Sequence, residues 1–304
     1  LTGGSDPGPA LRELARGDAE VVCGTLPIVK VHARTGRLDL SDVGILVLDE
    51  ADVLADAANA PALAEVRGAL PASVRGRNLQ VVLLSATLRS KEVAALEERA
   101  CWNATWVDLG TDGAADGAGT RAGVPDTVRH LAVRVAPDDD AWVGAGAPPV
   151  TTDAVHRGGV PGGSLDVDAS DKDAASEAIK RLKPLALLRL VDTFVMDQVL
   201  VFCRTNLDCD LVEQFLRGAS RAAASAAASD GGGRAVDKYS CAVLAGMRSQ
   251  HDRTRALEDF RGGSARILLA TDVAARGIDV VGLPFVVNLT LPESPEGYLH
   301  RSGR

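Results

Sequence analysis

Three carboxylates stand close together after one apolar run of the sequence. Residues 45–48 read ILVL, and Asp49, Glu50 and Asp52 follow them. A carboxylate at the end of a buried strand can hold Mg²⁺ through water, and a second can orient or deprotonate a water that attacks a γ-phosphate. The cation would also neutralise the repulsion between these carboxylates. Without any catalytic role, the same residues would place negative charge at the start of a helix over 51–60.

Polar residues also follow other apolar runs, and these residues are Ser85, Thr87, Arg204, Thr271 and Asp272. In open α/β sheets, ligands bind beyond the carboxyl ends of the strands, so we expect these side chains to line one crevice. Each has a purely structural alternative. Ser85 and Thr87 could cap a helix that begins near Ser90, Arg204 could pair with a surface carboxylate, and residues 300–304 could form an exposed basic tail.

The apolar runs themselves predict an α/β fold, because runs that are hydrophobic on both faces are typical of parallel strands covered by helices. They occupy residues 19–25, 43–49, 79–87, 199–205, 239–244, 265–272 and 284–292. Between them, the sequence predicts helices that run from Asn206 to a stop at Gly218 and from Ser249 to a stop at Gly262. A further helix over 176–194 should be kinked or divided by Pro184.

The length of 304 residues favours two domains. We expect the first at 1–109 and the second at 125–304, joined by a small, polar linker at 110–124. Two insertions are expected within the second domain. One lies near 137–175 and is rich in Asp, Gly and Pro, and the other, near 218–234, is of low complexity and offers little to pack.

Composition limits the kinds of partner that the chain can have. The net charge is −8 and only ten residues are aromatic, so any contact with nucleic acid must come from a few placed groups rather than a broad basic or stacking surface. Five cysteines without a CxxC pair favour reduced thiols over a metal site or disulfides. No apolar run approaches the roughly 20 residues that span a bilayer. We therefore expect an intracellular protein of the nucleus, the cytoplasm or both, without a membrane partner.

Five motifs follow one another along the chain: VLDEAD at 47–52, LLSATL at 83–88, VFCRT at 201–205, LLATDVAARGIDV at 268–280 and YLHRSGR at 298–304. Together they resemble the DEAD-box family of ATP-dependent RNA helicases. TWVDLG, VPDTVRH and NLTLPES are further similar to the DEAD-box subfamily with a SPRY domain inserted in its first motor domain. The resemblance implies two RecA-like domains with mostly parallel sheets, the first incomplete, and the use of ATP, Mg²⁺ and RNA.

The resemblance also assigns roles to single residues. Asp49 would bind Mg²⁺ through water, Glu50 would orient the attacking water, and Ser85 and Thr87 would couple the nucleotide state to RNA binding. The residues expected near ATP or its phosphates are Asp49, Glu50, Gly277, Asp279, His300, Arg301 and Arg304, the last as an arginine finger. Those expected to hold the RNA backbone are Gly4, Thr25, Arg204 and Thr271. Gln250 and Arg253 would help the two domains to meet.

The sequence departs from the family pattern in two ways. It contains no G-x-x-x-x-G-K-[ST] loop, which grips the β- and γ-phosphates. We therefore expect a fragment that lacks this loop, the Q motif and the final arginine finger, and that is inactive alone. In addition, Thr25–Ile28 read TLPI where the family reads TPGR, which should weaken RNA binding by the first domain.

The predicted function is thus that of an ATP-dependent RNA helicase that unwinds or remodels RNA, as single strands, duplexes or RNA–DNA hybrids. The alternative is a non-catalytic RNA-binding or scaffold protein with a degenerate helicase core. A phosphate loop encoded upstream of Leu1 would favour the enzyme.

Overall fold

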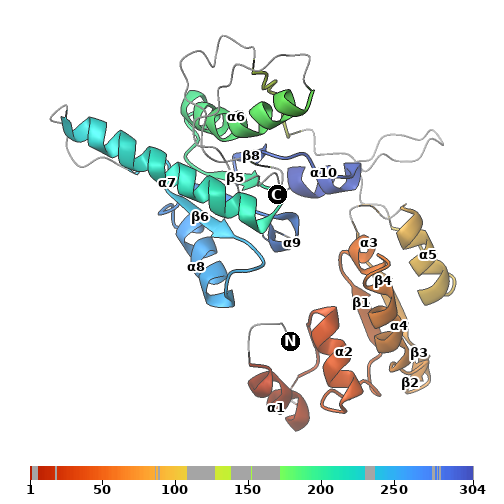
Figure 1. The fold of residues 1–304 in the computed structure, drawn as a ribbon. Coiled ribbons are helices and arrows are strands. Elements are labelled where there is room, and N and C mark those ends of the chain that lie inside the picture. Colours follow the sequence, from red (N-terminus) through yellow and green to blue (C-terminus); the bar gives the residue numbers. More distant parts are fainter. Residues whose placement is uncertain are drawn as a thin grey trace. The chain divides into compact units, whose positions relative to one another are not determined.

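The computed structural model describes residues 1, 6–17, 19–85, 87, 90–107, 127–137, 152, 172–229, 237–275, 278, 280 and 282–303. The chain divides into two compact units, Leu1–Gly123 and Val124–Arg304 (Figure 1). Parallel strand pairing occurs in both units, which confirms the predicted α/β fold with parallel sheets. The predicted linker at 110–124 lies outside the described residues, as do 138–151 and 153–171 of the first predicted insertion.

The first unit is built around one parallel strand pair. Its strands are β1 (Ile45–Leu48), β2 (Ser73–Val74), β3 (Arg77–Asn78) and β4 (Gln80–Leu83), and its helices are α1 (Gly8–Arg16), α2 (Leu26–Arg34), α3 (Ala51–Leu54), α4 (Ala60–Gly68) and α5 (Lys91–Ala100). β1 pairs with β4 in parallel, with Leu48 opposite Leu83, while β2 and β3 form a short antiparallel pair. A small core of Leu38, Leu40 and Val66 packs with residues of α1 and α2.

Two expectations for this unit are wrong. β1 is not buried on both faces, because Ile45 is 59% and Val47 53% exposed. The described sheet has only two strands here, so one face of β1 lacks cover from the described residues. Residues 19–25 do not form a strand either. They contact Leu1 instead, through a hydrogen bond of 2.9 Å from the Thr25 amide to the Leu1 carbonyl.

In the described part of the second unit, four strands form one parallel sheet in the order β6–β7–β5–β8 (Figure 1). They are β5 (Val199–Phe202), β6 (Cys241–Leu244), β7 (Ile267–Ala270) and β8 (Phe285–Asn288). The helices of this unit are α6 (Lys172–Thr193), α7 (Asn206–Ser229), α8 (Gln250–Arg261), α9 (Asp272–Ala275) and α10 (Pro295–Ser302). β5 and β7 are buried throughout, as expected for central strands.

Alternate residues of β5 enter two separate cores, as the period of two in a strand requires. Val199 and Val201 pack with residues of α6 and α7 on one face of the sheet. Leu200 and Phe202 pack with residues of α8 and α9 on the other. The prediction of a sheet covered by helices on both faces is therefore confirmed for this unit.

The helix boundaries agree with the sequence in one case and differ in another. α8 begins after Ser249, whose side chain caps it, and ends at Gly262, as predicted. α7 does not stop at Gly218 but continues to Ser229. Ala has the highest helix propensity, so the Ala-rich run that follows extends the helix past one glycine. The part of the second predicted insertion at 218–229 is therefore helical, and α6 likewise continues through Pro184.

Candidate functional site

The loops that follow β1 and β4 are joined by hydrogen bonds. The amide of Leu84 donates to the Leu48 carbonyl, and the amide of Ala51 donates to the Leu84 carbonyl, each at 2.9 Å. Beyond these bonds, Thr87 Oγ1 donates to Asp52 Oδ2 at 2.9 Å, and the Thr87 amide donates to Ser85 Oγ at 3.0 Å. The structure thus brings together the carboxylate motif and the Ser-Ala-Thr motif, as their positions after parallel strands predict.

Glu50 has an unusual backbone conformation. Its φ is 51° and its ψ 52°, in the left-handed region that is uncommon for residues other than glycine. The amide of Glu50 donates to Asp49 Oδ1 at 3.0 Å, and its carbonyl accepts from the amides of Val53 and Leu54. Residues in this conformation cluster at active sites, although Arg75, Asn103 and Val195, which lie outside the candidate site, also have a positive φ.

The structural alternatives for these loops hold only in part, because Asp52 lies in the first turn of α3, as the helix-start alternative requires. α3 has only four residues, and Glu50, at its N-cap, makes no capping hydrogen bond with its side chain. Ser85 and Thr87 do not cap the next helix, because Ser90 is the cap of α5 and its Oγ accepts from the Val93 amide at 3.2 Å.

Asp49 is suited to bind a Mg²⁺ ion whose other ligands are mainly water molecules and phosphate oxygens. Its side chain is exposed at the end of β1, and one of its oxygens already accepts from the Glu50 amide. Mg²⁺ usually keeps several waters and takes only one or two protein carboxylates. The donor set therefore fits the water-mediated role predicted for Asp49.

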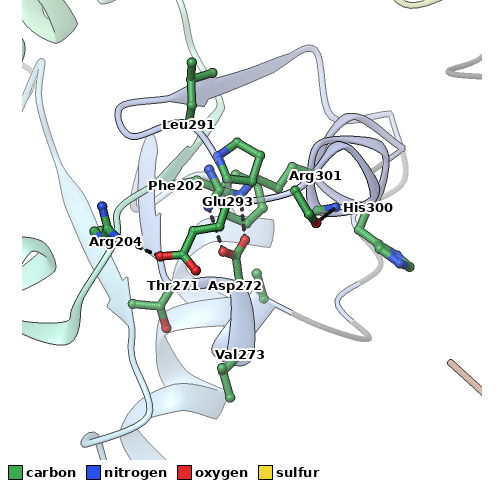
Figure 2. A pocket seen from close by; sticks show the side chains of 13 residues that line it. Phe202, Arg204, Thr271, Asp272, Val273, Leu291, Glu293, His300 and Arg301 are labelled. Atoms are coloured by element: carbon green, nitrogen blue, oxygen red, sulfur yellow. Dashed lines mark hydrogen bonds and ion pairs between the residues drawn. The ribbon is translucent and has the colours of Figure 1, made fainter. Parts of the chain in front are cut away.

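The second unit has a pocket of about 320 Å³ at the carboxyl ends of β5 and β7, beside α10 (Figure 2). Its lining includes four of the predicted site residues, namely Arg204, Thr271, His300 and Arg301. These residues come from positions almost 100 apart in the sequence, and the parallel sheet brings them to one edge, as expected for an open α/β fold.

Arg301 is held by protein groups on several sides. It is 3% exposed, and its Nε and Nη2 donate to the two carboxylate oxygens of Asp272 at 2.5 and 2.7 Å. Its Nη1 donates to Asn288 Oδ1 at 2.8 Å and to the Thr290 carbonyl at 2.6 Å. The guanidinium also lies 4.7 Å from the centre of the Phe202 ring. Arg301 is therefore not part of an exposed basic tail, and it connects α10 to the ends of β7 and β8.

Arg204 makes a different kind of contact. Its Nη2 donates to Glu293 Oε1 at 2.6 Å, and the two side chains are 48% and 83% exposed. Figure 2 shows the carboxylate of Glu293 directed at Arg204, and both residues line the pocket. The structural alternative for Arg204, a surface ion pair, is therefore confirmed, although an exposed pair of this kind leaves the guanidinium accessible.

Comparison with known proteins identifies the family. Residues 1–96 match the DEAD/DEAH box helicases, and residues 182–304 match the helicase conserved C-terminal domain. The ATP-dependent RNA helicase DDX1 of Xenopus laevis is 38% identical over 292 residues, which cover 94% of this chain and 36% of that protein. The chain belongs to the DEAD-box helicase family. The resemblance inferred from the five motifs is confirmed.

Other DEAD-box helicases agree with this assignment. The probable ATP-dependent RNA helicase ddx1 of Dictyostelium discoideum is 38% identical over 295 residues, which cover 94% of this chain and 35% of that protein. The chain thus spans about a third of the length of these curated relatives. The structure of S. cerevisiae Dbp5 bound to RNA and ADP BeF3 has a TM-score of 0.61, with 22% identity over 94% of this chain and 56% of that one. This likeness shows the fold, that of DEAD-box helicases with RecA-like domains.

The remaining site residues expected of a DEAD-box helicase are placed only in part. Thr25 is exposed at the N-cap of α2, where its side chain makes no capping hydrogen bond. The Nε of Arg253 is buried without a hydrogen-bond partner in the described part of the chain. Four predicted residues lie outside the described residues, and these are Gly4, Gly277, Asp279 and Arg304.

Sequence reasoning missed three residues around the site of this DEAD-box chain. Asn288 and Thr290 accept hydrogen bonds from Arg301, and Glu293 lines the pocket. Asn288 is the last residue of β8 and Thr290 lies two positions beyond it, so their position at a strand end was a usable signal. Glu293 offered no such signal, because it meets Arg204 from 89 positions away.

Proposed function

We propose that this chain is part of an ATP-dependent RNA helicase, which couples ATP hydrolysis to the unwinding or remodelling of RNA. The observation that carries the proposal is the hydrogen bond of 2.9 Å between Thr87 and Asp52. It joins the loop that bears the acidic motif to the loop that bears the Ser-Ala-Thr motif. The names of the relatives, which are ATP-dependent RNA helicases, support the same activity.

In this proposal, Glu50 acts on the attacking water. A carboxylate held in a fixed direction can orient that water and accept its proton, and the left-handed backbone of Glu50 fixes where the side chain begins. Asp49 would hold Mg²⁺ through water, and the ion would neutralise charge on the phosphates. A change at Asp52 on nucleotide binding would pass to Thr87 through their hydrogen bond.

RNA would be held along its backbone at the pocket of the second unit. Arg204 presents an accessible guanidinium, which forms strong charge-assisted hydrogen bonds with phosphate oxygens. Thr271 lines the same pocket. Contacts to phosphate carry no base information, so this site predicts RNA binding with little sequence preference.

RNA-stimulated release of phosphate tests the enzymatic proposal. The longest protein translated from the gene should hydrolyse ATP in the presence of RNA, and Glu50→Gln should lower kcat by about 10²- to 10⁴-fold, the usual contribution of a general base. Asp42→Asn, an exposed acidic position before β1, is a matched control and should retain activity. The 304-residue chain contains no G-x-x-x-x-G-K-[ST] loop and should release negligible phosphate alone.

The same assay discriminates the alternative function. RNA binding without hydrolysis by the longest protein would favour a non-catalytic RNA-binding or scaffold role. Hydrolysis that is unchanged by Glu50→Gln would contradict the mechanism proposed for the acidic motif.

A further inference from the structure

Two arginines line the pocket of the second unit, and their surroundings differ. Arg301 is buried and donates to Asp272, Asn288 and Thr290. A phosphate could reach this buried guanidinium only by displacing several of its hydrogen bonds, which is costly. Arg204 donates to Glu293, whose side chain is 83% exposed. Of these two cations, Arg204 is therefore the one that an incoming anion can engage easily.

The position of Glu293 makes it a competitor for that cation. It lies in the short segment between β8 and α10, and Figure 2 shows its carboxylate directed at Arg204. Its Oε1 accepts from Arg204 Nη2 at 2.6 Å, a short, charge-assisted contact. The guanidinium has five N–H donors, so a phosphate could bond to another of them, but the negative phosphate would then lie beside the Glu293 carboxylate and be repelled. The two anions therefore compete for Arg204.

We propose that, in the free chain, the Glu293 carboxylate is paired with the Arg204 guanidinium and must release it before an RNA phosphate binds to Arg204. Glu293 therefore sets the affinity and the salt dependence of RNA binding. This inference rests on the proposed function, in which Arg204 holds the RNA backbone. The exchange is feasible because the pair is exposed, and exposed ion pairs are weak. When RNA displaces Glu293, the released carboxylate regains cations from solution, which offsets part of the counterion release from RNA.

The test compares Glu293→Gln with the parent 304-residue chain. The amide side chain keeps the size of glutamate and removes its charge, and circular dichroism checks that the variant is folded. The probe is a fluorescent single-stranded oligouridylate, titrated by anisotropy at several salt concentrations. Glu293→Gln should bind about two- to fivefold more tightly, the factor expected from an exposed ion pair. The slope of log affinity against log salt should steepen by less than about 0.7, the full value for one contact to a single strand, because Glu293 offsets only part of the counterion release.

Two control variants separate competition for Arg204 from a general effect of charge. Glu296→Gln removes an exposed carboxylate three residues further on that does not line the pocket. It should change the affinity less than Glu293→Gln. In an Arg204→Ala background, Glu293→Gln should give no gain, because the contested donor is gone.

Three results would overturn the inference. If the parent binds RNA and Glu293→Gln leaves affinity and slope unchanged, Glu293 does not compete. If the gain persists in the Arg204→Ala background, or if Glu296→Gln gives the same gain, Glu293 acts only through its charge. A different result, in which neither the parent nor Glu293→Gln binds RNA at any salt concentration, would contradict the proposed function itself.

Discussion

Arg301 donates two parallel hydrogen bonds to the carboxylate of Asp272, from Nε at 2.5 Å and from Nη2 at 2.7 Å. Asp272 is the first residue of α9, two positions beyond the end of β7, and Arg301 lies on α10, 29 positions later. The pair therefore fixes the helix with the last family motif to the carboxyl end of the sheet. Because Arg301 is 3% exposed, the second unit should depend on it for stability as well as for any contact with phosphate.

Arg301→Ala should lower the free energy of unfolding of the second unit by about 2–4 kcal/mol. Breaking a buried pair costs about 3–5 kcal/mol, and the lower figure reflects the 45% exposure of the Asp272 side chain. Arg301→Lys should also destabilise, because an ammonium group cannot donate to both oxygens as the guanidinium does. Urea unfolding measures both. Arg204→Ala, which removes an exposed pair, is the control and should cost less than about 1 kcal/mol. Equal effects of Arg301→Ala and Arg204→Ala would contradict this account.

The sequence predicts the second unit better than the first, for physical reasons. The strand Ile267–Ala270 is buried on both faces, so an unbroken apolar run marks it. The helix over 250–261 is bounded by a serine cap and a glycine stop, and both are local signals. Residues 19–25 have the composition of a strand, but a strand also needs a neighbour to pair with, and composition does not show one.

The candidate site was likewise predictable from the sequence only in part. Its edge of the sheet could be predicted, because residues after parallel strands gather there whatever their separation in sequence. The hydrogen-bond partners within the site could not be predicted. The order of the motifs places Arg301 near phosphates, yet nothing local to Arg301 indicates that Asp272, Asn288 and Thr290 accept its hydrogen bonds.

Two glycines should respond in opposite ways to replacement by alanine. Gly218 lies within α7, and a Cβ there would meet no atom within 4 Å. Gly218→Ala should therefore stabilise the chain by about 0.5–1 kcal/mol through helix propensity and lower entropy of the unfolded state. Gly263 has a φ of 75°, which strains any residue with a Cβ, so Gly263→Ala should destabilise. Thermal unfolding measures the two shifts. A loss of stability in Gly218→Ala would mean that α7 does not continue through this position.

The cysteines should react with iodoacetamide in an order set by burial. Burial is the largest cause that raises the pKa of the Cys241 thiol to about 11, with the nearby Glu213 carboxylate acting in the same direction. At pH 8 about one molecule in a thousand then carries the reactive thiolate. Cys23 is exposed and should be labelled first, while Cys203 and Cys209 are buried and should react only on unfolding. Mass spectrometry of peptides at successive times gives the order. Because the pKa is raised, labelling of Cys241 should accelerate as the pH rises towards 11, and rapid labelling at pH 8 would show that this burial is wrong.

The bond between Thr87 and Asp52 can be tested through stability. Thr87→Val keeps the shape of the side chain and removes the hydroxyl that donates to Asp52 Oδ2. A hydrogen bond to a charged group contributes about 1.5–3 kcal/mol, and Asp52 is only half-buried, so we expect a loss of about 1–2 kcal/mol in the first unit. Thr87→Ser retains the donor and should lose less than half as much. Hydrogen exchange of the amides after β4 measures this locally, and equal behaviour of the two variants would show that the bond does not join the loops.

The salt dependence of RNA binding by the 304-residue chain tests most directly the claim that its second unit holds an RNA backbone. The variants are Arg204→Ala and, as a matched control, Arg217→Ala, which removes an exposed arginine from a surface pair with Glu213 on α7. The account predicts that Arg204→Ala weakens binding of a single-stranded RNA and makes the slope of log affinity against log salt shallower by up to about 0.7. Arg217→Ala should behave as the parent does. If Arg204→Ala and Arg217→Ala are indistinguishable from the parent in both affinity and slope, Arg204 does not contact RNA and the claim is wrong.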